Sequence, residues 1–200
     1  MEKEVDIISM SFGWVEEAEV DGKQVISDAI FKARSTTKVL FFAAASNYGA
    51  TKRELFPAHH ESVTSIRATD HFGGLLPFNA PPENSEVFGT LGYKVPCARL
   101  GPTKDEITVS GTSMATPIAA GIAALILGFA RLQLAADGEI NKPHPWKQLW
   151  TKAGMEQMFK QISRPTSVTH LQFLQPINFV KGEVDNKDRR RKIENAVGRK

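Results

Sequence analysis

GTSMATPIAAGIAALILGFAR, which runs from Gly111 to Arg131, is the stretch of sequence on which the rest of the architecture depends. A glycine, two hydroxyl residues and a proline stand before a run that is almost entirely apolar, which is typical of a tight turn leading into a buried helix. Pro117 has no backbone N–H and is tolerated best in the first turn of a helix, so we expect the helix to begin near Ser113. Alanines at every fourth position predict a helix in the middle of the core, closely approached by its neighbours.

The place of Ser113 at the start of this helix suggests a chemical role for its hydroxyl. The unpaired amides of the first turn and the positive end of the helix dipole can stabilise an anion that forms on or beside it. A lone serine before a helix is more often only an N-cap. The residues around it favour the chemical role.

GTSMATP at residues 111–117, followed by an alanine-rich apolar helix, resembles the nucleophile motif of the subtilisin-like serine proteases, the subtilases. A match over these consecutive positions is far more specific than a short glycine pattern. The resemblance implies a serine-type endopeptidase with Ser113 as its nucleophile and a polypeptide as its substrate, and it implies no cofactor. The family usually has a histidine directly after the proline, where this chain has Ile118. That histidine is not the catalytic one, so the chemistry is unaffected.

The elements before the long helix predict a parallel sheet. Residues 5–12 form a short apolar strand, residues 24–38 have apolar positions at helical spacing, and VLFFAAA at residues 39–45 is a strand buried on both faces. A strand, a helix and a fully apolar strand in this order are typical of a parallel βαβ unit. We therefore predict an α/β fold with three layers, in which helices cover both faces of a mostly parallel sheet. Relative to subtilases, this fold would be truncated at its N-terminus.

The VLFFAAA strand ends in Ala45, Ser46 and Asn47. Ligands of open parallel sheets gather beyond the carboxyl ends of the strands, although an asparagine before a glycine-containing loop is also a common turn residue. In subtilases a strand of this kind ends in Ala-Ala-Gly-Asn, and its asparagine donates to the oxyanion. The resemblance implies this role for Asn47, together with substrate contacts for Ala45 and Ser46.

SMSFG at residues 9–13 resembles the subtilase segment whose backbone pairs with the substrate as an extra strand. The resemblance therefore implies that Ser11, Phe12 and Gly13 bind substrate. His59 and His60 invite a metal interpretation, but adjacent side chains point to different sides and no partner stands at ligand spacing. We interpret them as surface residues and predict no metal site.

The triad of a serine protease is incomplete in this sequence. A serine hydroxyl needs a base, and the base needs a carboxylate that fixes its tautomer. The subtilase Asp and His motifs precede the serine, and neither Asp-Thr-Gly, Asp-Ser-Gly nor His-Gly-Thr occurs here. We expect residues 1–180 to be the C-terminal part of a subtilase domain, partnered by an N-terminal half outside this sequence.

Two other functions remain open. The chain could be a catalytically dead remnant that serves as a binding or regulatory module. A nucleotide-binding α/β domain is a weaker alternative, because neither GxGxxG nor GxxxxGK[ST] is present to bind phosphate.

The composition, with 42% apolar and 24% charged residues, is that of a globular domain. Residues 181–200 hold eight Lys or Arg and four Asp or Glu, so this end carries +4 and the rest of the chain is nearly neutral. The segment KDRRRK at residues 187–192 could be a nucleic-acid patch. A solvated, disordered basic tail fits the composition better, and no nucleic-acid partner is expected.

Compartment and membrane signals are weak. A single cysteine, Cys97, excludes an internal disulfide and slightly favours a reducing compartment. The N-terminus, MEKEVDIISMSFG, has acidic residues where a signal peptide has basic ones, so no export signal is predicted. The longest apolar run, about 13 residues from Ile118 to Ala130, is shorter than the ~20 needed to span a bilayer, so no membrane segment is predicted. The localisation stays open, with a weak preference for the cell interior.

Overall fold

The computed structural model describes residues 5–15, 22–36, 38–82, 86–98, 106–182 and 184–198. Its main sheet, within these ranges, has the strand order β1-β2-β3-β4-β8-β7. The sheet is parallel throughout except that β7 runs antiparallel to β8. Its strands are β1 (Ile7–Met10), β2 (Leu40–Ala44), β3 (Val63–Thr69), β4 (Val87–Leu91), β7 (Ser163–Pro165) and β8 (Leu171–Leu174); a separate antiparallel pair is formed by β5 (Val95–Ala98) and β6 (Glu106–Val109).

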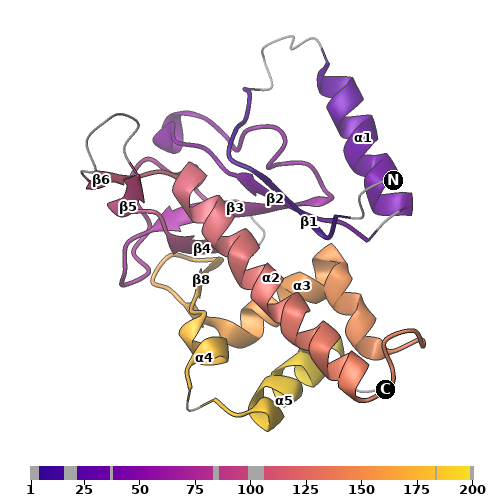
Figure 1. Cartoon of the computed structure of the whole chain (residues 1–200). Coiled ribbons are helices and arrows are strands. Elements are labelled where there is room, and N and C mark those ends of the chain that lie inside the picture. The colour runs from indigo at the N-terminus through magenta and orange to yellow at the C-terminus, as the bar shows by residue number, and fades with distance from the viewer. Residues whose placement is uncertain are drawn as a thin grey trace.

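Helices cover both faces of the main sheet (Figure 1). On β2, Leu40 and Phe42 join the large core beneath α2, whereas Phe41 and Ala43 join a smaller core with Ile30 of α1. This alternation follows from the pleat, which sends successive side chains to opposite faces. The helices are α1 (Lys23–Thr36), α2 (Thr112–Ala136), α3 (Lys152–Ile162), α4 (Ile177–Val180) and α5 (Asn186–Val197), with short 3₁₀ turns η1 (Gly49–Thr51) and η2 (Pro145–Trp150).

The predicted architecture is confirmed. The segments expected as strand, helix and buried strand become β1, α1 and β2, and β1 pairs in parallel with β2. Every residue of β2 is buried, as its unbroken apolar sequence predicted. The chain therefore has an α/β fold with a mostly parallel sheet between layers of helices.

The long central helix α2 packs against β1, β2, β3 and β4. It begins at Thr112, next to the predicted start, and the alanines at positions 115, 119 and 123 are fully buried. Within the described residues, it is the one helix that is long and apolar enough to cross a membrane by length and composition alone. This was not predicted from the sequence, because only the apolar run from Ile118 to Ala130 was considered and not the whole helix. Because its alanine face lies against the sheet, α2 is a core helix of this domain.

The prediction of a disordered tail is wrong for residues 186–197, which form α5. The carboxylate of Asp185 accepts a hydrogen bond from the backbone N–H of Asp188, at 2.7 Å, and so caps the helix. Ile193 and Val197 lie four residues apart on one face and are buried in the large core. The high charge of this segment led to the wrong prediction, because the two apolar residues that pack it against the domain are few. Residues 183, 199 and 200 lie outside the described ranges.

Asp6 connects the start of β1 to the far half of α2. Its carboxylate accepts two hydrogen bonds from the Arg131 guanidinium, each at 2.6 Å, and one from the Trp150 indole N–H at 2.9 Å. The hydrogen bonds from Arg131 are the main reason that the pKa of Asp6 lies below its ordinary value of 3.8, and burial opposes them. The ionised form of Asp6 therefore stabilises the fold.

We expect Asp6→Asn to lower the free energy of unfolding by about 1 kcal/mol at pH 7. Because the pKa is lowered in the folded state, this contribution is complete above pH 3.8 and is lost as the pH falls through the folded-state value. Urea denaturation at pH 7 and at pH 2 would measure the difference, which should shrink at the lower pH. A matched exposed carboxylate, Asp28, which accepts from Gln24 on the same helix α1, serves as the control and should change stability little. An equal loss for both variants would contradict the account.

Candidate active site

Ser113 stands in the first turn of α2 and is joined to Ser11, which follows β1, by two hydrogen bonds. The Ser113 hydroxyl donates to the Ser11 carbonyl at 3.2 Å, and the Ser11 hydroxyl donates to the Ser113 carbonyl at 2.9 Å. In an unbroken helix the Ser113 carbonyl would accept from the N–H of residue 117. Pro117 has no N–H, so that carbonyl is available to Ser11. The proline lies in the second turn of α2, not in the first as predicted. In this position it leaves the Ser113 carbonyl open to the Ser11 hydroxyl, and this hydrogen bond connects the end of β1 to the candidate nucleophile.

Asn47, which follows β2, lies against the turn that precedes Ser113. Its Oδ1 accepts from the backbone N–H of Thr112 at 2.9 Å and from the Thr112 hydroxyl at 3.0 Å. These bonds fix the orientation of the amide, because only the carbonyl oxygen can accept. Among the described residues, none accepts a hydrogen bond from Nδ2, so its two protons remain for a ligand. The structure thus brings Asn47 and Ser113 together at one place.

The turn before Ser113 is tight at Gly111. Gly111 has φ +157°, and a Cβ on it would lie 3.2 Å from Nδ2 of Asn47. A larger residue would push the amide away from the helix start. The close approach of Asn47 therefore depends on this position of the GTS motif.

The predicted substrate-binding residues differ in exposure. Phe12 is half exposed and Ser11 is exposed, whereas Ala45 and Ser46 are 0% and 1% exposed. Gly13 is partly buried. The segment at residues 11–13 is therefore accessible to a ligand, whereas the side chains of Ala45 and Ser46 are buried within the protein.

Sequence reasoning missed two features of this site. Thr112 orients Asn47, and it could have been found because it adjoins Ser113 within the motif. The pairing of Trp14 with Phe56, in which each N–H donates to the other carbonyl at 2.8 and 3.0 Å, had no sequence signal. It joins the segment after β1 to the segment before β3, which are distant in the chain.

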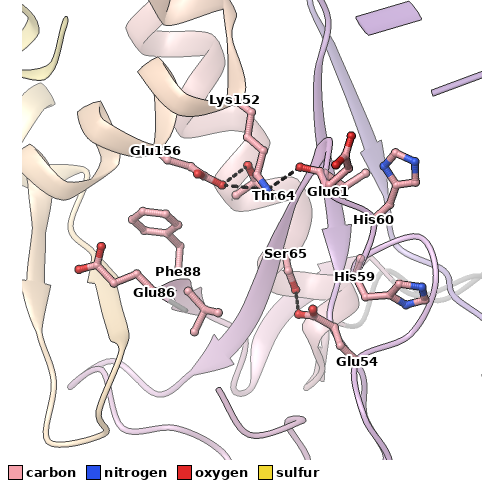
Figure 2. A pocket seen from close by; sticks show the side chains of 13 residues that line it. Glu54, His59, His60, Glu61, Thr64, Ser65, Glu86, Phe88, Lys152 and Glu156 are labelled. Atoms are coloured by element: carbon pink, nitrogen blue, oxygen red, sulfur yellow. Dashed lines mark hydrogen bonds and ion pairs between the residues drawn. The ribbon is translucent and has the colours of Figure 1, made fainter. Parts of the chain in front are cut away.

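None of the chain's five histidines, all within the described residues, is bonded to Ser113. His59 and His60 line a pocket of about 150 Å³ at the amino ends of β3 and β4, the end of the sheet opposite Ser113 (Figure 2). His59 is exposed, and burial is the main reason that the pKa of half-buried His60 lies below its ordinary value. In the described part of the chain, no three His, Cys, Asp or Glu side chains are grouped to hold a metal ion.

Comparisons with known proteins agree on one family. The sequence profile of the subtilase family matches residues 1–149. Among curated proteins, the chain is 33% identical over 122 residues to the minor extracellular protease Epr of Bacillus subtilis, covering 61% of this chain and 18% of that protein. It is 30% identical over 126 residues to subtilisin DY of Bacillus licheniformis, covering 62% and 43%.

Solved structures show the same fold. The protease domain of PatA, in a serine-to-alanine mutant, superposes with a TM-score of 0.64 at 28% identity, covering 86% of this chain and 57% of that one. The prenylagaramide maturation protease PagA gives a TM-score of 0.62 at 27% identity, covering 81% and 53%. The chain spans less than half of the length of the curated relatives and little more than half of these structures.

Proposed function

Because this chain belongs to the subtilase family of serine proteases, we propose that it is the C-terminal part of the catalytic domain of a serine endopeptidase. The observation that supports the proposal most is the contact of the Asn47 amide with the turn before Ser113. A hydroxyl at a helix start and an amide with two unused N–H bonds are the groups that acyl transfer requires of a nucleophile and an oxyanion donor. The protease family implies polypeptide substrates.

In the proposed reaction, Ser113 Oγ attacks the carbonyl carbon of the scissile peptide bond. The Oγ–C bond forms, the hydroxyl proton passes to a base, and the oxyanion is held by Asn47 Nδ2 and the Ser113 amide. The base then gives this proton to the leaving amine as the C–N bond breaks. Water then attacks the acyl carbonyl and gives a proton to the base, and the base returns it to Ser113 Oγ as the Oγ–C bond breaks and the acid leaves. Ser11, Phe12 and Gly13 bind the substrate backbone.

The histidine base and its aspartate partner would come from a segment outside these residues, and the surface near β1 supports this. β1 is an edge strand of the described sheet, and its Ile8 side chain is 37% exposed. The outward face of α2 carries Leu125 and Leu132, which are 56% and 71% exposed. Parallel sheets are normally covered on both faces and protected at their edges. A segment with further strands and a helix would cover both surfaces, as the N-terminal half of this domain.

A catalytically dead remnant that binds peptides is the second candidate. It is favoured by the Ser113 hydroxyl, which donates to a backbone carbonyl and has no histidine among its partners. Sequencing the 5′ end of the transcript separates the two functions. A reading frame that continues upstream through a strand with Asp and a helix with His supports the enzyme, and an upstream stop codon supports the remnant.

A further inference from the structure

The outward face of α2 carries an apolar seam in which large and small residues alternate. Leu125 and Leu132 are 56% and 71% exposed. Gly121 and Gly128 are exposed as well, and a Cβ on either would meet no atom of the described residues within 4 Å. Figure 1 shows α2 lying across the front of the sheet. The α2 seam, whose members follow the spacing of a heptad repeat, consists of Ile118, Gly121, Leu125, Gly128, Leu132 and Ala135. An exposed seam of this kind indicates a surface that packs against another helix.

No isolated charge opposes such packing. Among residues 117–136, all of which the structure describes, Arg131 is the only charged one. Its guanidinium donates two hydrogen bonds to the carboxylate of Asp6, each at 2.6 Å. A second apolar surface laid on the seam would therefore not bury a charge that lacks a counter-ion.

The order of large and small residues makes the α2 seam complementary to itself. A twofold axis through the midpoint of the seam would set two copies of α2 antiparallel, with residues at equal distances from that midpoint opposite each other. Leu125 would then face Gly128 of the second copy, and Leu132 would face Gly121. The two ends of the seam would pair a large with a small residue in the same way. A parallel arrangement would instead set leucine against leucine and glycine against glycine, which crowds one layer and leaves the next one empty.

We propose that the partner of the α2 seam is a second copy of this chain, in an antiparallel dimer with twofold symmetry. A twofold dimer uses the same surface of both copies, which a self-complementary seam allows. The seam is about 26 Å long at 1.5 Å per residue, so the interface is smaller than that of a permanent dimer and association is weak. The proposed N-terminal half would cover the same face of α2 and so competes with the second copy. The dimer is therefore a property of the chain of 200 residues.

Sedimentation equilibrium of the whole chain measures this association. We expect a monomer–dimer equilibrium with a Kd on the order of 10 µM. Gly128→Leu should raise the Kd about tenfold or more, because Leu125 would then meet a leucine across the axis. The double variant Leu125→Gly with Gly128→Leu exchanges the two sizes, so each large residue again faces a small one. It should restore the dimer, which neither a parallel pairing nor a loss of folding would explain.

Val25→Ala is the matched control, because Val25 is 71% exposed, like Leu132, but lies on α1. It should leave the Kd unchanged. An equal loss of association in Val25→Ala, a dimer that Gly128→Leu does not weaken, or one that the double variant does not restore overturns the inference.

A chain that stays monomeric far above the expected Kd overturns the inference as well. Flotation of this monomer with phosphatidylcholine vesicles would then assign the α2 seam to a lipid surface, and a monomer that does not float would leave the seam to the N-terminal half. The proposed function stands in each of these cases, since none of the measurements depends on catalysis.

Discussion

Replacing Ser113 with alanine is expected to lower kcat about a million-fold in a form of the protein whose sequence continues upstream through the Asp and His motifs. The base and the carboxylate act on the serine hydroxyl, so neither accelerates the reaction when the nucleophile is absent. The residual rate would come from binding and from the oxyanion donors. Hydrolysis of a chromogenic peptide measures the loss, and mass spectrometry of the trapped acyl-enzyme identifies the modified residue.

Ser110→Ala is the control for this loss. Ser110 is also a serine on the approach to α2, and its hydroxyl accepts from the backbone N–H of Lys94 at 2.9 Å. Its removal should leave kcat nearly unchanged. A Ser113→Ala variant that hydrolyses peptides at the parent rate would show that another group is the nucleophile.

The second large effect is expected at Asn47. Asn47→Ala removes one of the two proposed oxyanion donors and should lower kcat about 10²–10³-fold with little change in KM, because the oxyanion exists only after attack. Asn47→Asp sharpens the test. A carboxylate oxygen can still accept from Thr112, at the positions now 2.9 and 3.0 Å from Oδ1, but it cannot donate. Its kcat should fall at least as far as that of the alanine variant.

A control amide far from Ser113 is available in Asn178, which donates to the carbonyl of Ile162 at 3.2 Å. Asn178→Ala should leave kcat and KM unchanged. If Asn47→Asp were as active as the parent protein, the amide would be a structural support for Thr112 and not an oxyanion donor.

The parts of the fold that the sequence predicted are those with a local pattern. VLFFAAA is short and apolar at every position, which predicted a strand buried on both faces, and β2 is fully buried. The glycine, hydroxyl and proline residues before the apolar run located the start of α2 to within one residue. The site residues were predicted mainly from resemblance: GTSMATP pointed to Ser113, and Asn47 was proposed from the same resemblance together with its place after a parallel strand.

The features that were missed depend on contacts between distant segments. Pro117 was expected in the first turn, and only the structure shows that the freed Ser113 carbonyl accepts from Ser11. The segment of α5 was predicted to be a disordered tail because its 12 residues are mostly polar or charged, and this composition outweighed the two apolar residues that pack in the large core.

We propose that Ser113 becomes a nucleophile only when a base from outside these residues reaches its hydroxyl. The measurement that tests it most directly is the rate of peptide hydrolysis by the purified chain of 200 residues alone, compared with the form that continues through the Asp and His motifs. We expect no turnover by the chain alone and turnover by the longer form. Turnover by the chain alone that Ser113→Ala abolishes would contradict it.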